Sequence, residues 1–82
     1  MFYVYILKSQ KDSHFYIGKT NNFNRRFKEH NSGKVLSTKS RKPFILLKLI
    51  EVETQEESVN LEREYKKGFR REELKKEFGG FA

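Results

Sequence analysis

The side chains best suited to chemistry are two tyrosines, an arginine and a histidine near the amino terminus. Tyr5 and Tyr16 lie in two short aromatic segments, and Arg26 and His30 follow four residues apart. Side chains at that spacing are neighbours on the surface of a helix. Arginine binds phosphate bidentately, and a tyrosine hydroxyl, whose pKa is ordinarily about 10, becomes a useful base when a nearby cation lowers that pKa. These residue types together favour chemistry at a phosphate group.

A predicted hairpin must position the two tyrosines. The β-branched and aromatic run of residues 2–7 predicts a buried strand, and the run of residues 14–17 predicts a second one. Asp12 and Ser13 suit a turn between the two strands, and Gly18 ends the second strand. Because the connection is short, the two strands are expected to pair as an antiparallel hairpin.

A predicted helix must position Arg26 and His30. Either Asn21 or Asn22 can cap its beginning, and the helix is expected to run to about Asn31 before Gly33 ends it. Three side chains lie along one side of this helix: Phe23, Phe27 and His30.

The second part of the chain supplies a third strand and a helix. After a loop over residues 31–43, the apolar run of residues 44–52 predicts the longest strand. Thr54 and Glu57 have the spacing of a capping box, in which the glutamate reaches back to the first residue of the cap. A helix is therefore expected to begin directly after Thr54.

The pattern of the last thirty residues completes an α+β domain. Gly68 is expected to break the helical pattern, with a final helix over residues 71–78 and a frayed tail from Gly79-Gly80. Apolar side chains of the earlier helix face the core at positions four apart: Leu61, Tyr65 and Phe69. The order β-β-α-β-α-α predicts a three-stranded antiparallel sheet flanked by helices, in a single domain over residues 1–82.

Composition and charge limit the classes of function. The 82 residues contain no cysteine, which excludes disulfides and thiolate metal sites and fits a reducing, cytoplasmic location. Neither a signal peptide nor a membrane span is expected, because no apolar stretch is long enough. Residues 1–50 hold eleven Lys and Arg against two acidic residues, whereas residues 51–82 hold seven against nine. The basic half favours a polyanionic partner.

The ordered set of these features resembles the GIY-YIG nuclease family. The first family motif corresponds to residues 3–5, with Tyr3 in place of its glycine, and the second to residues 16–18. Residues 19–30 are similar to the family's first helix, and residues 61–65 to its glutamate-bearing helix. The likeness covers nearly the whole chain.

The resemblance implies a site in which one glutamate holds a single divalent metal, Mg²⁺ or Mn²⁺. It implies that a tyrosine, either Tyr5 or Tyr16, helps to activate the attacking water, while Arg26 and His30 contact the phosphate. A structural role in packing or capping the end of its helix is the alternative for His30. Carboxylate, phosphate and water suit Mg²⁺ or Mn²⁺ better than Zn²⁺.

The glutamate of this site has two candidates. The resemblance favours Glu64, directly before Tyr65, as the catalytic and metal-binding carboxylate, with Glu62 as the alternative. With Leu61 and Tyr65 facing the core, the two glutamates fall on opposite edges of the buried side of the helix.

Basic residues around the site predict contacts to the nucleic-acid backbone. Such contacts give binding that is sensitive to salt and largely independent of sequence. The candidates are Lys19, Arg25, Lys34, Lys39, Arg41 and Lys42. For the four in the loop, the alternative is a role in solubility alone.

We expect the protein to be an endonuclease that hydrolyses DNA phosphodiesters, with RNA as an open alternative substrate and branched or nicked DNA as candidate targets. Specificity is expected to come from the domain, from self-association or from a partner protein. Some family nucleases have a late asparagine near the metal, and here none follows residue 60. A second hypothesis is therefore an inactive nucleic-acid-binding module, and a third is a protein-interaction domain.

Overall fold

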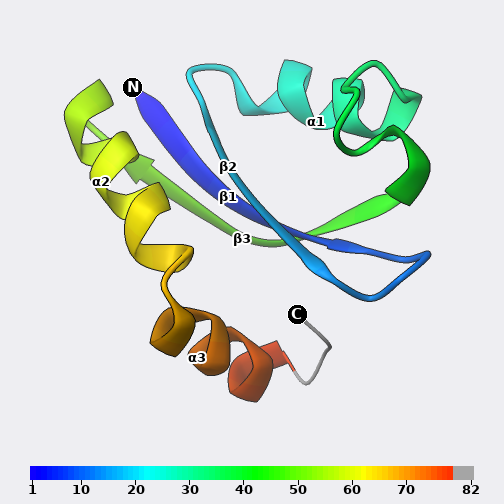
Figure 1. Ribbon diagram of the computed structural model, residues 1–82. Helices are drawn as coiled ribbons and strands as arrows, with labels where there is room; N and C mark the ends of the chain where they lie inside the picture. Colours follow the sequence, from blue (N-terminus) through cyan, green and yellow to red (C-terminus); the bar gives the residue numbers. More distant parts are fainter. Residues whose placement is uncertain (79–82) are drawn as a thin grey trace.

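The chain folds around one antiparallel sheet with the strand order β2-β1-β3 (Figure 1). The computed structural model describes residues 1–78, and for residues 68–71 it describes the backbone alone. The strands are β1 (Phe2–Ser9), β2 (Phe15–Thr20) and β3 (Phe44–Val52). The helices are α1 (Phe23–Ser32), the short 3₁₀ helix η1 (Lys39–Arg41), α2 (Gln55–Tyr65) and α3 (Gly68–Phe78). The predicted α+β order, β-β-α-β-α-α, is confirmed.

The central strand β1 contributes to two separate cores because its side chains alternate between the faces of the sheet. Val4 and Ile6 point to the face that α2 and α3 cover, whereas Tyr5 and Leu7 point to the face that α1 covers (Figure 1). The α2/α3 core also contains Phe15, Ile17, Tyr65 and Leu74. The α1 core also contains Phe44, with Tyr16, Phe23 and Phe27 packed against it.

A β-bulge in β3 adjusts which of its side chains reach each core. Ile6 pairs with Lys48, but the next residue, Leu7, pairs with Leu46, so Leu47 is an extra residue on β3. A bulge of this kind changes the alternation of side chains along the strand. Leu47 consequently packs against the α2/α3 core.

The helix ends lie near the predicted positions: side chains cap the beginnings of α1 and α2, and a glycine ends α1. Asn22, not Asn21, caps α1, because its Oδ1 accepts a hydrogen bond from the Arg25 N–H at 3.1 Å. Gly33 ends α1 in the left-handed region, with φ of 81°. Thr54 caps α2 by accepting a hydrogen bond from the Glu57 N–H at 3.1 Å.

Three local expectations differ from the structure. The carboxylate of Glu57 accepts from the Thr54 hydroxyl at 3.2 Å, where a capping box would use the Thr54 N–H. The loop after α1 is partly ordered, because η1 lies within it, and α3 begins at Gly68, three residues before the expected start. The side chain of Phe69, whose core contact was predicted, is not described. The predicted tail at Gly79-Gly80 lies outside the described residues.

Candidate active site

Tyr5 is at the centre of a polar cluster on the α1 face. Its side chain is 1% exposed, and its Oη lies 2.9 Å from Nε2 of His30. Its ring lies directly over Gly18, its partner in the hairpin, because a Cβ added to Gly18 would come within 2.5 Å of Tyr5 Cζ and Oη. The glycine of the second motif is therefore required by this close approach, and it leaves the edge of β2 free of a side chain.

His30 continues the cluster away from the tyrosine. Its side chain is fully buried, and its Nδ1 lies 2.8 Å from Oγ1 of Thr38. The ring of Tyr16 packs edge-on against it, with the ring centroids 4.9 Å apart. Burial, together with the charge of Arg26, lowers the pKa of His30 to about 4. The imidazole is therefore neutral at physiological pH, and the structure brings together two of the predicted site residues, Tyr5 and His30.

Arg26 provides the cation of the cluster. Burial lowers the pKa of its guanidinium, but hydrogen bonds to Tyr5 and to Glu29 more than offset burial, and the pKa is raised overall. Its Nη1 lies 3.2 Å from Oε1 of Glu29. Burial raises the pKa of Tyr5 to about 12, and the hydrogen bond from Arg26 opposes this rise. Tyr5 is consequently a neutral phenol close to the cation of Arg26.

A carboxylate reaches the same edge of the sheet from the opposite face. Lys19 follows Gly18 on β2, and its Nζ lies 3.6 Å from Oε1 of Glu62 in α2. The other oxygen of Glu62 lies 3.6 Å from Nζ of Lys66, and the carboxylate side chain is 18% exposed. After burial and Tyr16, the charge of Glu62 also raises the pKa of Tyr5. The carboxylate of Glu62 is therefore near enough to Tyr5 for its charge to be felt there.

Glu64, the glutamate that the resemblance favours, lies on the other side of α2. Its carboxylate pairs with Lys67 at 2.8 Å, and it lines a shallow surface cavity together with Val52 at the end of β3. Residues two positions apart on a helix point about 200° apart, so Glu62 and Glu64 cannot share an edge of the sheet. Glu62, the alternative, is the carboxylate that the structure brings to the β2 edge.

Arg41, a predicted contact to nucleic acid, is held by contacts within the fold. Its Nε donates to Asp12 Oδ2 at 2.9 Å, its Nη2 donates to the Phe15 carbonyl at 3.3 Å, and the guanidinium lies 5.6 Å from the ring centroid of Phe44. The His14 N–H and this arginine lower the pKa of Asp12 to about 2. The guanidinium thereby ties the loop before β3 to the β1–β2 hairpin.

The other predicted basic residues fall into two groups. Arg25 and Lys34 line a groove of about 300 Å³ along α1, together with Lys28, which the sequence did not single out. Lys39 and Lys42 lie against Gly33 at the carboxyl end of α1, where a Cβ on the glycine would be 3.3 Å from Lys42 Nζ. Cations are favoured at that end of a helix dipole, so the position suits both lysines.

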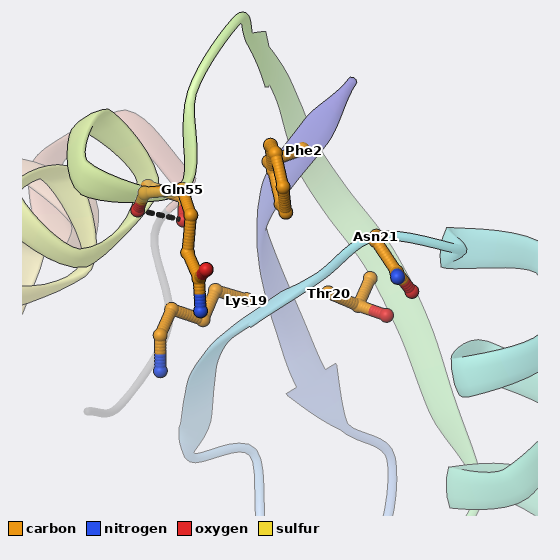
Figure 2. Close-up of a pocket in the computed structure, with 6 residues that line it drawn as sticks. Phe2, Lys19, Thr20, Asn21 and Gln55 are labelled. Atoms are coloured by element: carbon orange, nitrogen blue, oxygen red, sulfur yellow. Dashed lines mark hydrogen bonds between the residues drawn. The ribbon is translucent and has the colours of Figure 1, made fainter.

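Another hollow adjoins Lys19 (Figure 2). It measures about 250 Å³ and opens between the start of β1, the end of β2 and the first turn of α2. The side chain of Gln55 extends toward Lys19 across it (Figure 2). Its lining residues are Phe2, Lys19, Thr20, Asn21, Gln55 and Ser58. The surface beside the Lys19–Glu62 pair is thus concave and polar.

Thr38 is the site residue that the sequence did not indicate. It is fully buried beside His30 although it belongs to a basic loop, where nothing in the local pattern distinguishes it. Among the described residues, no group of three or more His, Cys, Asp or Glu side chains could hold a metal by itself. Within residues 1–78, no helix is long and apolar enough to span a membrane.

Comparisons with known proteins identify the class of this domain. Residues 1–77 match the GIY-YIG catalytic domain. The chain therefore belongs to the GIY-YIG family. It is also similar to the solution structure of the UPF0213 protein BH0048 from Bacillus halodurans, at 36% identity and a TM-score of 0.58, over 96% of this chain and 87% of that one. No curated protein matches it.

Proposed function

We propose that the protein is a metal-dependent endonuclease that hydrolyses DNA phosphodiester bonds. The observation that carries this proposal is that two neighbouring residues of β2, Gly18 and Lys19, contact polar groups on opposite faces of the sheet. Tyr5, hydrogen-bonded to His30 at 2.9 Å, approaches from the α1 face, and Glu62, paired with Lys19 at 3.6 Å, approaches from the α2 face. Phosphodiester hydrolysis needs a base, a cation for the phosphoryl oxygens and a metal ligand in one place.

Glu62 is the proposed ligand of Mg²⁺ or Mn²⁺. It offers hard carboxylate oxygens at a partly open position, and these ions typically complete their coordination with phosphate oxygens and water. A bound divalent ion would polarise the phosphoryl group and lower the pKa of a coordinated water. Lys19 and Lys66 hold the two Glu62 oxygens, and binding of the ion requires at least one of these ammonium groups to move to the substrate phosphate.

Arg26 and Tyr5 act on the phosphate and on the attacking water. The guanidinium of Arg26 binds the phosphate bidentately and neutralises its charge. Tyr5 is the proposed base: its Oη accepts a proton from the water and passes its own proton to Nε2 of His30, 2.9 Å away. The charge of Arg26 is one cause of the low pKa of His30, and pairing with phosphate offsets that charge. Substrate binding therefore makes His30 a better proton acceptor.

Tyr16 is the second candidate for the base. Its ring centroid lies 4.9 Å from that of His30 and 6.3 Å from that of Tyr5. The hydrogen bonds to His30 and Arg26 favour Tyr5. Tyr5→Phe is accordingly expected to reduce kcat more than Tyr16→Phe, and the reverse order would assign the base to Tyr16.

The DNA backbone is expected to follow the basic groove along α1 and to reach the site at Lys19. Arg25, Lys28 and Lys34 line the groove, and Lys39 and Lys42 lie at the end of α1. Arg41 is left out of this surface because Asp12 and the Phe15 carbonyl hold it. Such contacts predict binding that weakens steeply with salt and reads little sequence.

The deciding experiment is a cleavage assay with Mn²⁺ or Mg²⁺ over single-stranded, duplex and branched DNA and a matched RNA, with two variants. Glu62→Gln is expected to reduce cleavage at least about 100-fold. Glu64→Gln, a matched change on the same helix, is expected to retain the parent rate. A larger loss in Glu64→Gln would move the metal to that carboxylate. A folded parent that cuts no substrate with either metal would overturn the proposed activity.

A nucleic-acid-binding module without hydrolytic activity is the second candidate. The observation in its favour is the pair of lysines at Glu62, which neutralise the carboxylate without a metal. In that case DNA binding would survive the combined change of Glu62→Gln and Arg26→Ala, and the parent would show no cleavage stimulated by metal. Loss of both binding and cleavage in the double variant would instead support the nuclease.

A further inference from the structure

A buried row of hydrogen-bonding groups leads inward from Tyr5 and ends in the loop after α1. Tyr5 Oη lies 2.9 Å from His30 Nε2, and His30 Nδ1 lies 2.8 Å from Thr38 Oγ1. The Thr38 hydroxyl then donates to the Val35 carbonyl at 3.4 Å. Tyr5, His30 and Thr38 are each at most 1% exposed. With water largely excluded, these groups must satisfy one another.

The protons available along this row determine the state of the imidazole. Thr38 has a single hydroxyl proton, and a backbone carbonyl can only accept. When the hydroxyl donates to Val35, its oxygen accepts from His30, so the ring carries its proton on Nδ1. Nε2 is then an acceptor for the Tyr5 hydroxyl. Arg26 is a donor only, so it cannot take that proton. With the ring proton on Nδ1, every hydrogen-bonding group in the row has a partner.

The opposite direction leaves the tyrosine proton unpaired. If Thr38 donated to Nδ1, the Val35 carbonyl would keep only its bond from the Thr38 N–H. His30 would then present Nε2–H to Tyr5, whose oxygen would accept it. The tyrosine proton would have no acceptor within the row. An unsatisfied buried polar group is costly, so the network favours protonation at Nδ1.

We propose that Thr38 is a positioning residue that holds His30 in its Nδ1–H tautomer. Nε2 is thereby kept free to take the Tyr5 proton when Tyr5 accepts one from the attacking water, which leaves an imidazolium and a hydroxide-like nucleophile. The catalytic consequence rests on the proposed nuclease function, whereas the tautomer is a property of the folded chain by itself.

The loop around Thr38 is built to keep its hydroxyl in place. The Thr38 N–H donates to the Val35 carbonyl at 3.1 Å, and the Thr38 carbonyl accepts from the Arg41 N–H at 2.9 Å. The side chain of Arg41 is in turn anchored on Asp12. Arg41, a predicted contact to nucleic acid, thus supports Thr38 through its backbone N–H while its side chain anchors the loop on Asp12.

The test is two-bond ¹H–¹⁵N correlation NMR on ¹⁵N-labelled protein near neutral pH, where the two ring nitrogens of a neutral histidine are distinguished. The exposed His14 is replaced by glutamine so that His30 gives the only imidazole signals. The parent is expected to carry its ring proton on Nδ1. Thr38→Val should move that proton to Nε2, and Thr38→Ser should leave it on Nδ1. Ser58→Ala removes a buried hydroxyl on the other face of the sheet and should change nothing.

The cleavage assay supplies the second readout. Thr38→Val is expected to reduce kcat by about 10- to 100-fold with little change in KM, the size of effect found when a histidine loses the partner that orients it. Thr38→Ser is expected to restore most of that rate. A parent ring protonated at Nε2, or a folded Thr38→Val that keeps Nδ1–H, would overturn the proposal. A parent that cuts no DNA would remove the catalytic role, and the spectra would decide the tautomer separately.

Discussion

The two faces of the sheet use the same strand for opposite purposes. On the α2/α3 face, Val4 and Ile6 are fully buried among apolar side chains. On the α1 face, Tyr5 is equally buried but is bound to His30, which in turn is bound to Thr38. Alternation along β1 thus separates an apolar core from a polar cluster by a single residue step. The comparison teaches that one strand can bury hydrogen-bonded polar groups on one face because the other face buries only apolar side chains.

Neighbouring residues of β2 carry contacts on both faces. Gly18 lies beneath the ring of Tyr5 on the α1 face, and Lys19, the next residue, pairs with Glu62 of α2 at 3.6 Å. Glu64 instead pairs with Lys67 at 2.8 Å. The packing of α2 against β2 therefore places Glu62 beside the β2 edge.

The largest expected effect is on the packing face. Ile6→Ala deletes a fully buried side chain and should lower the free energy of unfolding by about 2–5 kcal/mol. Urea denaturation measures this loss, and kcat of the remaining folded protein should not change. Ile45→Ala, at a position 40% exposed on β3, is the control and should cost less than about 1 kcal/mol. Equal costs at the two positions would contradict the assignment of this core.

The next effect is a pH dependence that arises from the α1 face, where His30 is buried. The pKa of His30 falls from 6.5 to about 4 on folding, so the unfolded chain binds the proton first as the pH falls. Its contribution to stability is complete above about pH 6.5 and is lost as the pH falls to about 4, a total of roughly 3 kcal/mol. Urea midpoints of the parent and of His30→Gln should therefore converge over this range.

His14→Gln is the control for that titration. His14 is exposed, so its replacement should leave the parent's pH dependence unchanged. A constant difference between the parent and His30→Gln from pH 6.5 to 4 would show that His30 is not buried as a neutral ring.

A smaller effect is expected at Gly18, which lies beneath the ring of Tyr5. Gly18→Ala places a Cβ within 2.5 Å of the Tyr5 hydroxyl and should displace the ring from His30. Cleavage should fall by about 10- to 100-fold, because a displacement of about 1 Å is enough to cost that much. Gly33→Ala instead strains a residue with φ of 81°, so it should cost about 1 kcal/mol of stability and spare kcat. A loss of kcat in Gly33→Ala but not in Gly18→Ala would contradict this expectation.

The smallest effect concerns two cations of the loop region. Lys34→Gln should reduce the slope of log affinity against log salt by about one, with stability changed by less than about 0.5 kcal/mol. Arg41→Gln should leave that slope unchanged and lower stability by about 1 kcal/mol, since the bonds to Asp12 and the Phe15 carbonyl are lost. DNA titrations at several salt concentrations, run beside urea denaturation, separate the two results.

The sequence by itself determined the elements and their order. The apolar run of residues 2–7, the caps at Asn21 or Asn22 and at Thr54, and the break at Gly68 are local signals, because each depends on residues only a few positions apart. The same short range explains why the spacing of Arg26 and His30 predicted that they would lie on one side of a helix. The sheet type followed from the order of these elements.

Only the tertiary structure decided how distant residues complete the site. Glu62 and Glu64 flank the same buried stripe, so local periodicity cannot choose between them; the packing of α2 against β2 turns Glu62 toward Lys19. Thr38 and Arg41 lie in a basic loop, and their roles come from partners such as His30 and Asp12 that are distant in sequence. Such pairings depend on chain closure, which no local pattern encodes.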